Sequence, residues 1–325
     1  MGISVSVTSL VVIDGDIIGY KCAAASEQRT IQVVHKQSQR TKQFKTRTEF
    51  KSWLKEQDKW EELDFEIEDV QTPEPIENCL HSVKRMIENI HTASGCKEFK
   101  VVVQGEGNFR DNLLLPTRYK SNRDDMLKPV HLQETKQYLQ GKYNAELSVN
   151  RESDDVLASY AWEGYTNKQR IVAATVDKDA KQQMGWLFNW DKMTEPTFIK
   201  GLGELFINNK GKAEGFGRKW LVYQAAVGDS SDCYKPTELT KFKYGDKAAV
   251  KDFGELKTDK ECWQKLAALY QTWYPESFTY AAWNGAEVEA DWMSMMQLYV
   301  DAAHMQRFEN DRVIVKNVLT KMEII

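Results

Sequence analysis

The chain has 325 residues, of which 42% are hydrophobic and 28% are charged, so it can bury a core for one or two domains and is not broadly disordered. Its net charge of −4 argues against a protein that binds nucleic acid through overall positive charge alone. The five cysteines are scattered, and neither a Cys-x-x-Cys nor a His-x-His pair occurs, which argues against a disulfide framework or a zinc site. We expect a cytoplasmic protein without a leader or a membrane span, since no apolar run of about 18 residues is present.

The first part of the sequence predicts a strand, a helix and an insertion. Residues 5–13 are apolar and β-branched and end at Asp14-Gly15, which predicts a buried strand followed by a helix over residues 17–25. Residues 30–50 are basic and partly alternating, as in a hairpin followed by a helix, whereas residues 56–69 are acidic. We interpret residues 30–70 as a solvated surface insertion, with DNA binding by its basic half as the alternative.

A second strand and a basic segment follow. The sequence predicts a helix over residues 76–92 and a buried strand over 99–103, after which Glu106 stands between two glycines. Between residues 118 and 142, six basic side chains face only three acidic ones, and Tyr119 stands beside Lys120. Cations with an interleaved aromatic ring suit a phosphate backbone and a stacked base, although a solvated polar loop explains this segment about as well.

The interpretation is organised around residues 150–158. Glu152, Asp154 and Asp155 lie within four positions and are followed at once by a helical apolar pattern. If Ser153 caps this helix, the helix dipole favours each of the two aspartates by only ~0.3–1 kcal/mol. A divalent cation, which takes oxygen ligands, would explain why three anions are packed together. An acidic, solvated helix start is the alternative.

The remaining sequence adds four acids at the ends of predicted elements. Residues 170–176 predict a third buried strand, which ends at Asp177-Lys-Asp179, and Asp229 and Asp232 follow a predicted helix. Further expected elements are a hairpin over residues 201–212, short helices over 220–227 and from 245, and helices beyond 257, where a Trp and Met stripe indicates core packing.

Nine carboxylates thus stand where a strand ends or a helix begins: Asp14, Glu106, Glu152, Asp154, Asp155, Asp177, Asp179, Asp229 and Asp232. In open α/β sheets a ligand site lies outside the carboxyl ends of the strands. So many acids could share one cleft only with cations. Two metal ions would balance the charge and suit in-line phosphodiester displacement, one activating the attacking water and the other stabilising the leaving oxygen.

In their order and spacing these motifs resemble the bacteriophage branch of the 5′-nuclease superfamily, the flap endonucleases and 5′-to-3′ exonucleases, and most closely the exonucleases of T7-like phages. Val-Ile-Asp14-Gly resembles the first-strand motif, and Arg118-Tyr-Lys-Ser-Asn-Arg resembles the motif at the base of the arch. The spacings Glu-x-Asp-Asp, Asp-x-Asp and Gly-Asp-x-x-Asp resemble the remaining acid motifs. The resemblance covers about residues 10–255.

The resemblance implies an α/β fold with a mainly parallel twisted sheet between helices, and a two-metal 5′-to-3′ exonuclease on duplex DNA. It also implies flap cleavage, removal of RNA primers from RNA–DNA hybrids, and a phage enzyme that acts as a monomer in the host cytoplasm. Two Mg²⁺ or Mn²⁺ ions are implied, the first held by Asp14, Glu106, Glu152, Asp154 and Asp155 and the second by Asp177, Asp179, Asp229 and Asp232. Lys120 would stabilise charge on the scissile phosphate, Tyr119 would stack on the terminal base, and Arg123 would contact phosphate, with Arg118 and Lys128 as further DNA contacts.

By the same resemblance residues 1–257 are the nuclease domain and residues 258–325 a helical extension. The domain would contain the 30–70 insertion, a helical arch at 118–142 and a degenerate helix-two-turn-helix at 228–257. Two features depart from the family. Glu106 stands where the family usually has Asp, and its spacing to the Asn-Phe-Arg that follows differs by one residue. Cys233-Tyr-Lys replaces the first glycines of a K⁺-binding motif, which leaves a K⁺ site in doubt.

Two other functions compete with the nuclease. In a haloacid-dehalogenase-like phosphatase, Asp14 would be the nucleophile and Asp16 the general acid, but Glu152-Ser-Asp-Asp would be left unexplained. A non-catalytic DNA-binding factor on the same fold is the other alternative, although such a protein has no need of nine clustered carboxylates.

Overall fold

A six-stranded sheet forms the centre of the computed structural model, which describes residues 9–57 and 59–325. Its strands, in spatial order, are β6 (Glu146–Val149), β5 (Glu98–Glu106), β1 (Leu10–Asp14), β7 (Ile171–Ala174), β8 (Gly185–Phe188) and β9 (Thr197–Ile199). All neighbours are parallel except β8 and β9. The predicted α/β fold and its three buried strands are confirmed, while residues 5–8 of the first predicted strand lie outside the described residues.

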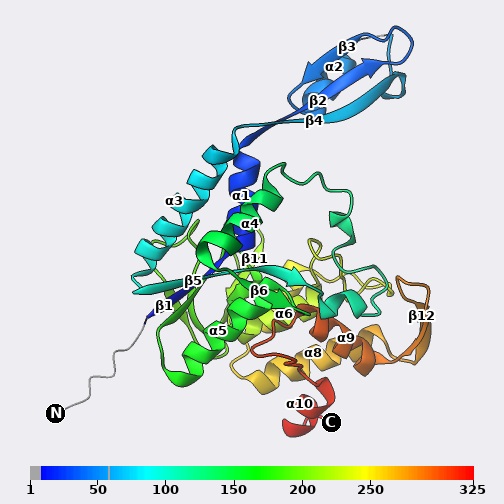
Figure 1. Cartoon of the computed structure of the whole chain (residues 1–325). Helices are drawn as coiled ribbons and strands as arrows, with labels where there is room; N and C mark the ends of the chain where they lie inside the picture. Colours follow the sequence, from blue (N-terminus) through cyan, green and yellow to red (C-terminus); the bar gives the residue numbers. More distant parts are fainter. Residues whose placement is uncertain (1–8, 58) are drawn as a thin grey trace, which may run out of the picture.

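Helices cover both faces of this sheet (Figure 1). One face carries α1 (Gly15–Ala25), α3 (Ile76–Ser94) and α4 (Leu132–Tyr143), and the other carries α5 (Ser153–Asn167). Strand alternation explains the layers, because Val11 and Ile13 pack toward α1 and α3 whereas Val12 packs toward α5. Gly15 lets α1 begin against β5, since a Cβ at this position would lie 2.6 Å from the Val103 side chain.

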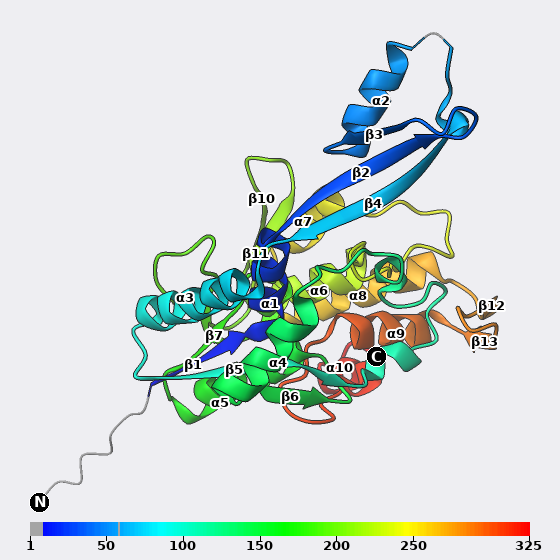
Figure 2. The same cartoon turned by 45° about the horizontal axis from the view of Figure 1, so that its top comes forward.

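Residues 27–73 form an arm that extends away from the rest of the molecule in two views (Figures 1 and 2). It contains the antiparallel strands β2 (Glu27–His35), β3 (Thr41–Phe44) and β4 (Phe65–Pro73), together with α2 (Arg47–Lys55). The predicted hairpin and helix over residues 30–50 are confirmed. The acidic half is mostly exposed, but it is a paired strand and not a loop, because β4 pairs along the whole of β2 and Phe65 joins a small core with Ile31 and Phe50.

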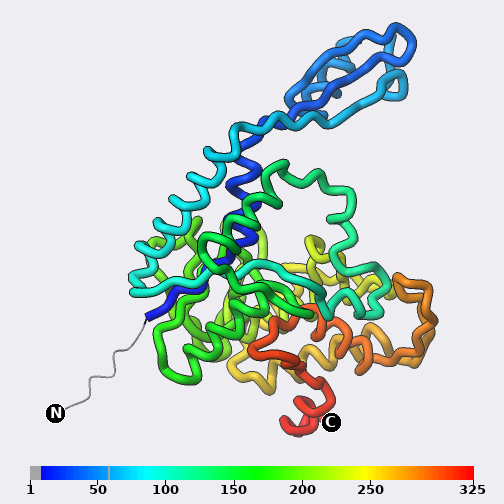
Figure 3. The backbone as a smooth tube through the Cα atoms, viewed as in Figure 1, coloured from blue at the N-terminus to red at the C-terminus, as the bar shows by residue number. Residues whose placement is uncertain are grey.

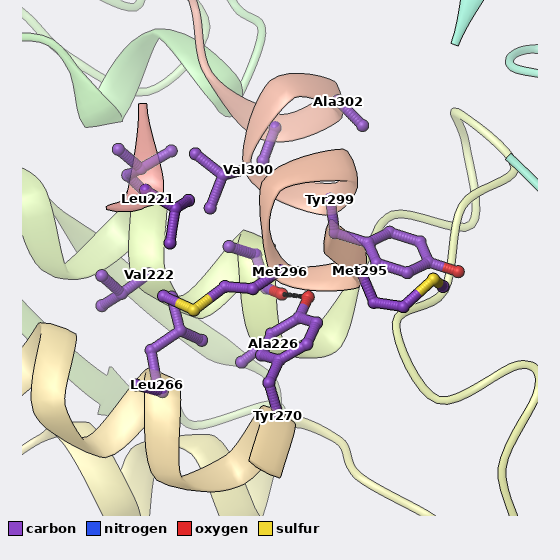
Figure 4. Packing of buried hydrophobic residues seen from close by; sticks show 14 of the residues in the cluster. Leu221, Val222, Ala226, Leu266, Tyr270, Met295, Met296, Tyr299, Val300 and Ala302 are labelled. Atoms are coloured by element: carbon purple, nitrogen blue, oxygen red, sulfur yellow. Dashed lines mark hydrogen bonds between the residues drawn. The ribbon is translucent and has the colours of Figure 1, made fainter. Parts of the chain in front are cut away.

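The C-terminal half of the chain forms the largest core. Its elements are β10 (Glu204–Ile207), β11 (Ala213–Phe216), α6 (Arg218–Val227), α7 (Asp246–Phe253), α8 (Asp259–Trp273), β12 (Phe278–Ala281), β13 (Glu287–Ala290), α9 (Trp292–Ala303) and α10 (Val315–Lys321). Leu221 of α6, Leu266 of α8 and Met296 of α9 pack together in this core (Figure 4). The Trp and Met stripe is therefore confirmed as core packing. The expectation of helices alone beyond residue 257 is wrong, because β12 and β13 form a hairpin there.

The predicted helical arch is only partly helical. Of residues 118–142, α4 takes up the part from Leu132 onward, and residues 118–131 run as a loop with one 3₁₀ turn, Ser121–Arg123 (Figure 3). Similarly, residues 228–257 contain a single helix, α7, preceded by turns. Within the described ranges, no helix combines the length and the apolar character that a membrane crossing needs.

Candidate metal centre

The predicted acids gather at the carboxyl edge of the sheet because several elements end or begin there. Asp14 closes β1 and Asp177 follows β7, while Glu152 caps the start of α5 just after β6. Asp229 and Asp232 lie in the turn that follows α6. Gly228 makes this turn possible, since its φ is +86° and a Cβ would lie 2.3 Å from the Tyr234 carbonyl oxygen.

Three of these acids form a cluster with the spacing of a metal site. Carboxylate oxygens of Asp179, Asp229 and Asp232 all lie within 4.8 Å of one another. Burial and the neighbouring Asp177, Asp229 and Asp232 raise the pKa of Asp179 well above its usual value. Burial also acts on Asp229, but hydrogen bonds from Lys178, at 2.7 Å, and from Ser231 outweigh it and lower the pKa of that carboxyl. Three of the four acids predicted for the second metal are thus brought together, and Asp177 is not part of this cluster.

A second group of acids surrounds Asp14, which is only 1% exposed. Asp14 accepts hydrogen bonds from the Ile17 backbone N–H at 3.1 Å and from the Thr175 hydroxyl at 2.7 Å. Burial, together with the charges of Asp16 and Asp177, raises its pKa from 3.8 to about 7. Burial and the charges of Asp14 and Asp177 likewise raise the pKa of Asp154 well above its usual value. Asp177, predicted for the second site, therefore adjoins both groups.

Asp155 does not face this centre as a free ligand. It is 0% exposed, and its two oxygens accept hydrogen bonds from the Arg110 guanidinium at 2.7 and 3.0 Å. The Gln306 and Glu152 backbone N–H groups also donate to it, at 2.8 and 3.0 Å. The prediction that Asp155 binds a metal is not supported by this geometry, because its oxygens already accept hydrogen bonds that hold the start of α5 in place. The sequence analysis missed Arg110 as its partner, although Asn108-Phe-Arg stood directly after β5.

The arch-base residues reach the acids, but not all in the predicted roles. Lys120 forms ion pairs with Glu152 and, at 3.7 Å, with Asp232, and Arg123 lies 3.1 Å from Asp232. Tyr119 is only 5% exposed, its hydroxyl donates toward Glu152 and Asp232 at 3.0 Å each, and its ring stacks on Tyr234. A ring buried in this way offers no face to a terminal base, so that expectation is corrected for this structure.

The two outer cations of the predicted DNA contacts differ in their position relative to the acidic centre. Arg118 forms an ion pair with Asp124 and lies over the Trp283 ring, with 6.0 Å between its guanidinium carbon and the ring centroid. Lys128 is exposed and lines a cavity of about 370 Å³ that also touches Asp16 and Lys136. Lys128 is thus positioned beside the centre, whereas Arg118 faces the C-terminal hairpin.

The prediction for Glu106 is not supported by its position, and Asp16 takes up that side of the centre. Glu106 is exposed, and its backbone follows an irregularity in the pairing of β5 with β6. Asp16 instead accepts a hydrogen bond from the Gln104 backbone N–H at 2.6 Å, while the Gln104 side chain accepts one from Ser153. Burial and the charge of Glu152 contribute to raising the pKa of Asp16. The sequence signal was present in Asp14-Gly-Asp16, but it was assigned only to the phosphatase alternative.

The charges at this edge fit divalent cations. With Asp16 in place of Glu106, nine carboxylates meet five cationic side chains, Arg110, Lys120, Arg123, Lys136 and Lys178. When all nine carboxylates are ionised, they exceed the five cations by four charges, which equals the charge of two divalent ions. Carboxylate oxygens are also the donors that Mg²⁺ and Mn²⁺ prefer.

This excess predicts an unusual pH dependence of stability without metal. The raised pKa values of Asp14, to about 7, and of Asp154 and Asp179 mean that the folded chain keeps protons that the unfolded chain releases. Stability therefore falls as pH rises through the window from about 4 to about 7. The lowered pKa values of Asp155 and Asp229 give the opposite slope only at lower pH, near and below their ordinary range.

In EDTA we expect the Tm to be higher at about pH 5 than at about pH 7.5, by ~3 °C or more for a chain of this size. Added Mg²⁺ should raise the Tm more at the higher pH, because metal ligands must be deprotonated. Differential scanning calorimetry at both pH values measures this. A higher Tm at pH 7.5 than at pH 5 in EDTA would contradict the electrostatic description of the centre.

Comparisons with known proteins give one kind of match. No family model matches the chain, and no curated protein matches it. Similar solved structures come from the phage 5′-nuclease class. One is bacteriophage T5 5′-exonuclease with bound zinc, with a TM-score of 0.48 and 14% identity over 97% of this chain and 98% of that chain. Another is a T5 flap endonuclease variant in complex with DNA and metal ions, with a TM-score of 0.43 and 12% identity over 97% and 98%. Similarity at this level establishes no activity, so the function has to be argued from the centre itself.

Proposed function

We propose that this chain is a divalent-metal-dependent nuclease that cleaves DNA from a 5′ end. The observation that carries the proposal is the convergence of Asp179, Asp229 and Asp232 within 4.8 Å beside the buried Asp14 and the partly exposed Asp154. The 5′-to-3′ direction is inferred from the order of the sequence motifs, which resembles that of phage 5′ nucleases. Flap cleavage, primer removal and a monomeric state belong to the same proposal.

The residues divide into ligands and cations. Asp14, Asp16, Asp154 and Asp177 would hold one Mg²⁺ or Mn²⁺, and Asp179, Asp229 and Asp232 the other. When bound, the ions would lower the pKa of the attacking water and stabilise the leaving oxygen. Lys120 and Arg123 would bind the scissile phosphate. Each already forms an ion pair with a carboxylate of the centre, and an incoming phosphate would replace that carboxylate as the partner. Arg110 would keep Glu152 oriented, at 3.3 Å.

Asp16 is proposed as a ligand in place of Glu106. Asp16→Asn is expected to weaken binding of one Mn²⁺ about tenfold, or ~1.4 kcal/mol, because it removes a charge that adjoins Asp14. Glu106→Gln is the matched control and should bind Mn²⁺ like the wild type, because the Glu106 side chain is exposed. Calorimetric Mn²⁺ titration measures both. Equal losses in the two variants, or a loss only in Glu106→Gln, would reverse the assignment.

A substrate panel tests the proposed function and its alternatives. We expect Mg²⁺-dependent cleavage of a blunt duplex, a 5′-flap duplex and an RNA–DNA hybrid, with Ca²⁺ and EDTA as inactive conditions. Hydrolysis of p-nitrophenyl phosphate with no cleavage of DNA would instead support the phosphatase. Tight DNA binding without turnover under any metal would support the non-catalytic factor.

A further inference from the structure

A cavity outside the acidic centre lies in the C-terminal half of the chain. It has a volume of about 510 Å³ and is bounded by α5, α6, α8, α10 and the segment after α9. None of the centre's carboxylates lines it. Between the two sites runs the backbone of residues 302–306, whose His304 carbonyl accepts from Arg110 at 2.6 Å and whose Gln306 N–H donates to Asp155. An occupant of the cavity would therefore leave the acids uncovered.

The cavity is lined by cations and by no acid. Arg218, Arg307, Arg312 and Lys321 contribute to its wall. Each arginine forms an ion pair with one aspartate, as in the pairs of Arg307 with Asp311 at 2.7 Å and of Arg312 with Asp301 at 2.6 Å. A guanidinium has five N–H donors, so these pairs leave donors free for an incoming anion. Lys321 is exposed and forms no ion pair within the described residues.

Most of the remaining lining is apolar, and the polar groups that could read a nucleobase are few, namely Gln182, Gln183, His304 and Asn317. Leu221, Trp263, Val318 and Met322 supply much of this surface. The Gln182 side chain is already used, donating to the Ala303 carbonyl and accepting from the Met305 N–H. A base edge would therefore find few hydrogen-bonding partners. His304 lines the cavity as well, and its Nδ1 atom is buried without a hydrogen-bond partner in the described part of the chain.

We propose that this cavity binds a short acidic peptide segment of a partner protein, in which an apolar side chain stands next to carboxylates. The apolar side chain would fill the space against Leu221, Trp263 and Val318. The carboxylates would accept hydrogen bonds from the free guanidinium donors and from Lys321. Charge complementarity and a volume in the range of ordinary ligand sites support this class of occupant.

Fluorescence polarisation with a labelled peptide, Gly-Asp-Asp-Leu-Asp-Phe with a free carboxyl end, tests the proposal on the full chain. Lys321→Glu and the cavity-filling Asn317→Trp should each weaken binding about fivefold or more. Both positions are exposed, so folding should survive, and a thermal scan confirms it. The matched control is Lys316→Glu on the same helix, which does not line the cavity and should change binding less than about twofold.

Two further experiments distinguish binding of the acidic peptide from binding of other ligands. A peptide with Asn in place of each Asp, amidated at its end, should bind at least about fivefold more weakly, and raising NaCl from about 50 to about 300 mM should weaken the acidic peptide. Absence of binding at millimolar peptide, equal binding of the uncharged peptide, or an effect of Lys316→Glu equal to that of Lys321→Glu would overturn the proposal. Displacement of the peptide by dAMP, with dAMP binding sensitive to the same two variants, would assign the cavity to a nucleotide instead.

Discussion

Asparagine in place of Asp179 is expected to reduce metal-dependent DNA cleavage by at least ~10³-fold, about 4 kcal/mol in transition-state stabilisation. The substitution keeps the shape of the side chain, and its oxygen can still accept the hydrogen bond from Gln224. It removes one of the three charges that lie within 4.8 Å and would hold the second ion. Cleavage rates at saturating Mg²⁺ measure the loss.

The same substitution should have the opposite effect on stability. Burial and its acidic neighbours raise the pKa of Asp179, so without metal its ionised form is unfavourable. In EDTA at about pH 7.5, Asp179→Asn is therefore expected to raise the Tm. Glu195→Gln, at an exposed position, is the control and should change neither activity nor Tm. Full activity in Asp179→Asn would show that the cluster does not serve the reaction, and lost activity with a lowered Tm would indicate damage to the fold.

Arg110→Ala is expected to lower the free energy of unfolding by ~3–5 kcal/mol. Arg110 is 2% exposed, and its guanidinium is held by Asp155 and by the Ala302 and His304 carbonyls. Without it, the buried Asp155 loses its cation and keeps only the hydrogen bonds from two backbone N–H groups, and the two backbone carbonyls lose the guanidinium donors. Urea unfolding at neutral pH measures the change.

The arm provides a matched control for this prediction. Arg47 also forms two hydrogen bonds with one carboxylate, Asp69, at 2.6 and 2.8 Å, but both side chains are well exposed. Arg47→Ala should therefore cost less than ~1 kcal/mol. Similar losses for the two variants would contradict the assignment of Arg110 as the buried link between α5 and the C-terminal segment.

The sequence predicted the sheet edge well because each local signal agreed with the fold. Val11 to Ile13 and Val101 to Val103 are continuous apolar runs, which is the pattern of strands buried on both faces, and each is followed by a polar turn. The acids at those turns could only meet at one edge once the strands were parallel. Phe65-Glu-Ile67-Glu alternates as a half-buried strand does, but the acidic charge of residues 56–69 favoured a solvated segment, so the β4 strand was missed.

Other features depended on contacts that no local pattern contains. Asp154 and Asp155 are neighbours in the sequence, and no local pattern distinguishes them. Asp155 is structural because Arg110, which belongs to another element, binds it, whereas Asp154 remains a candidate metal ligand. Tyr119 looked like an exposed stacking residue because it stands in a basic run, but its ring is packed against Tyr234. Glu106 is exposed at a point where the pairing of β5 with β6 has become irregular, which no local pattern in the sequence predicts.

The most direct test of the metal-dependent nuclease uses one duplex labelled at the 5′ end of one strand and, separately, at its 3′ end. With Mg²⁺ the account predicts early release of short 5′-labelled products while the 3′-labelled strand shortens gradually, and no products in EDTA. Asp154→Asn should abolish both signals. Cleavage that persists in EDTA, or early release of the 3′ label, would contradict the proposed metal centre or its direction.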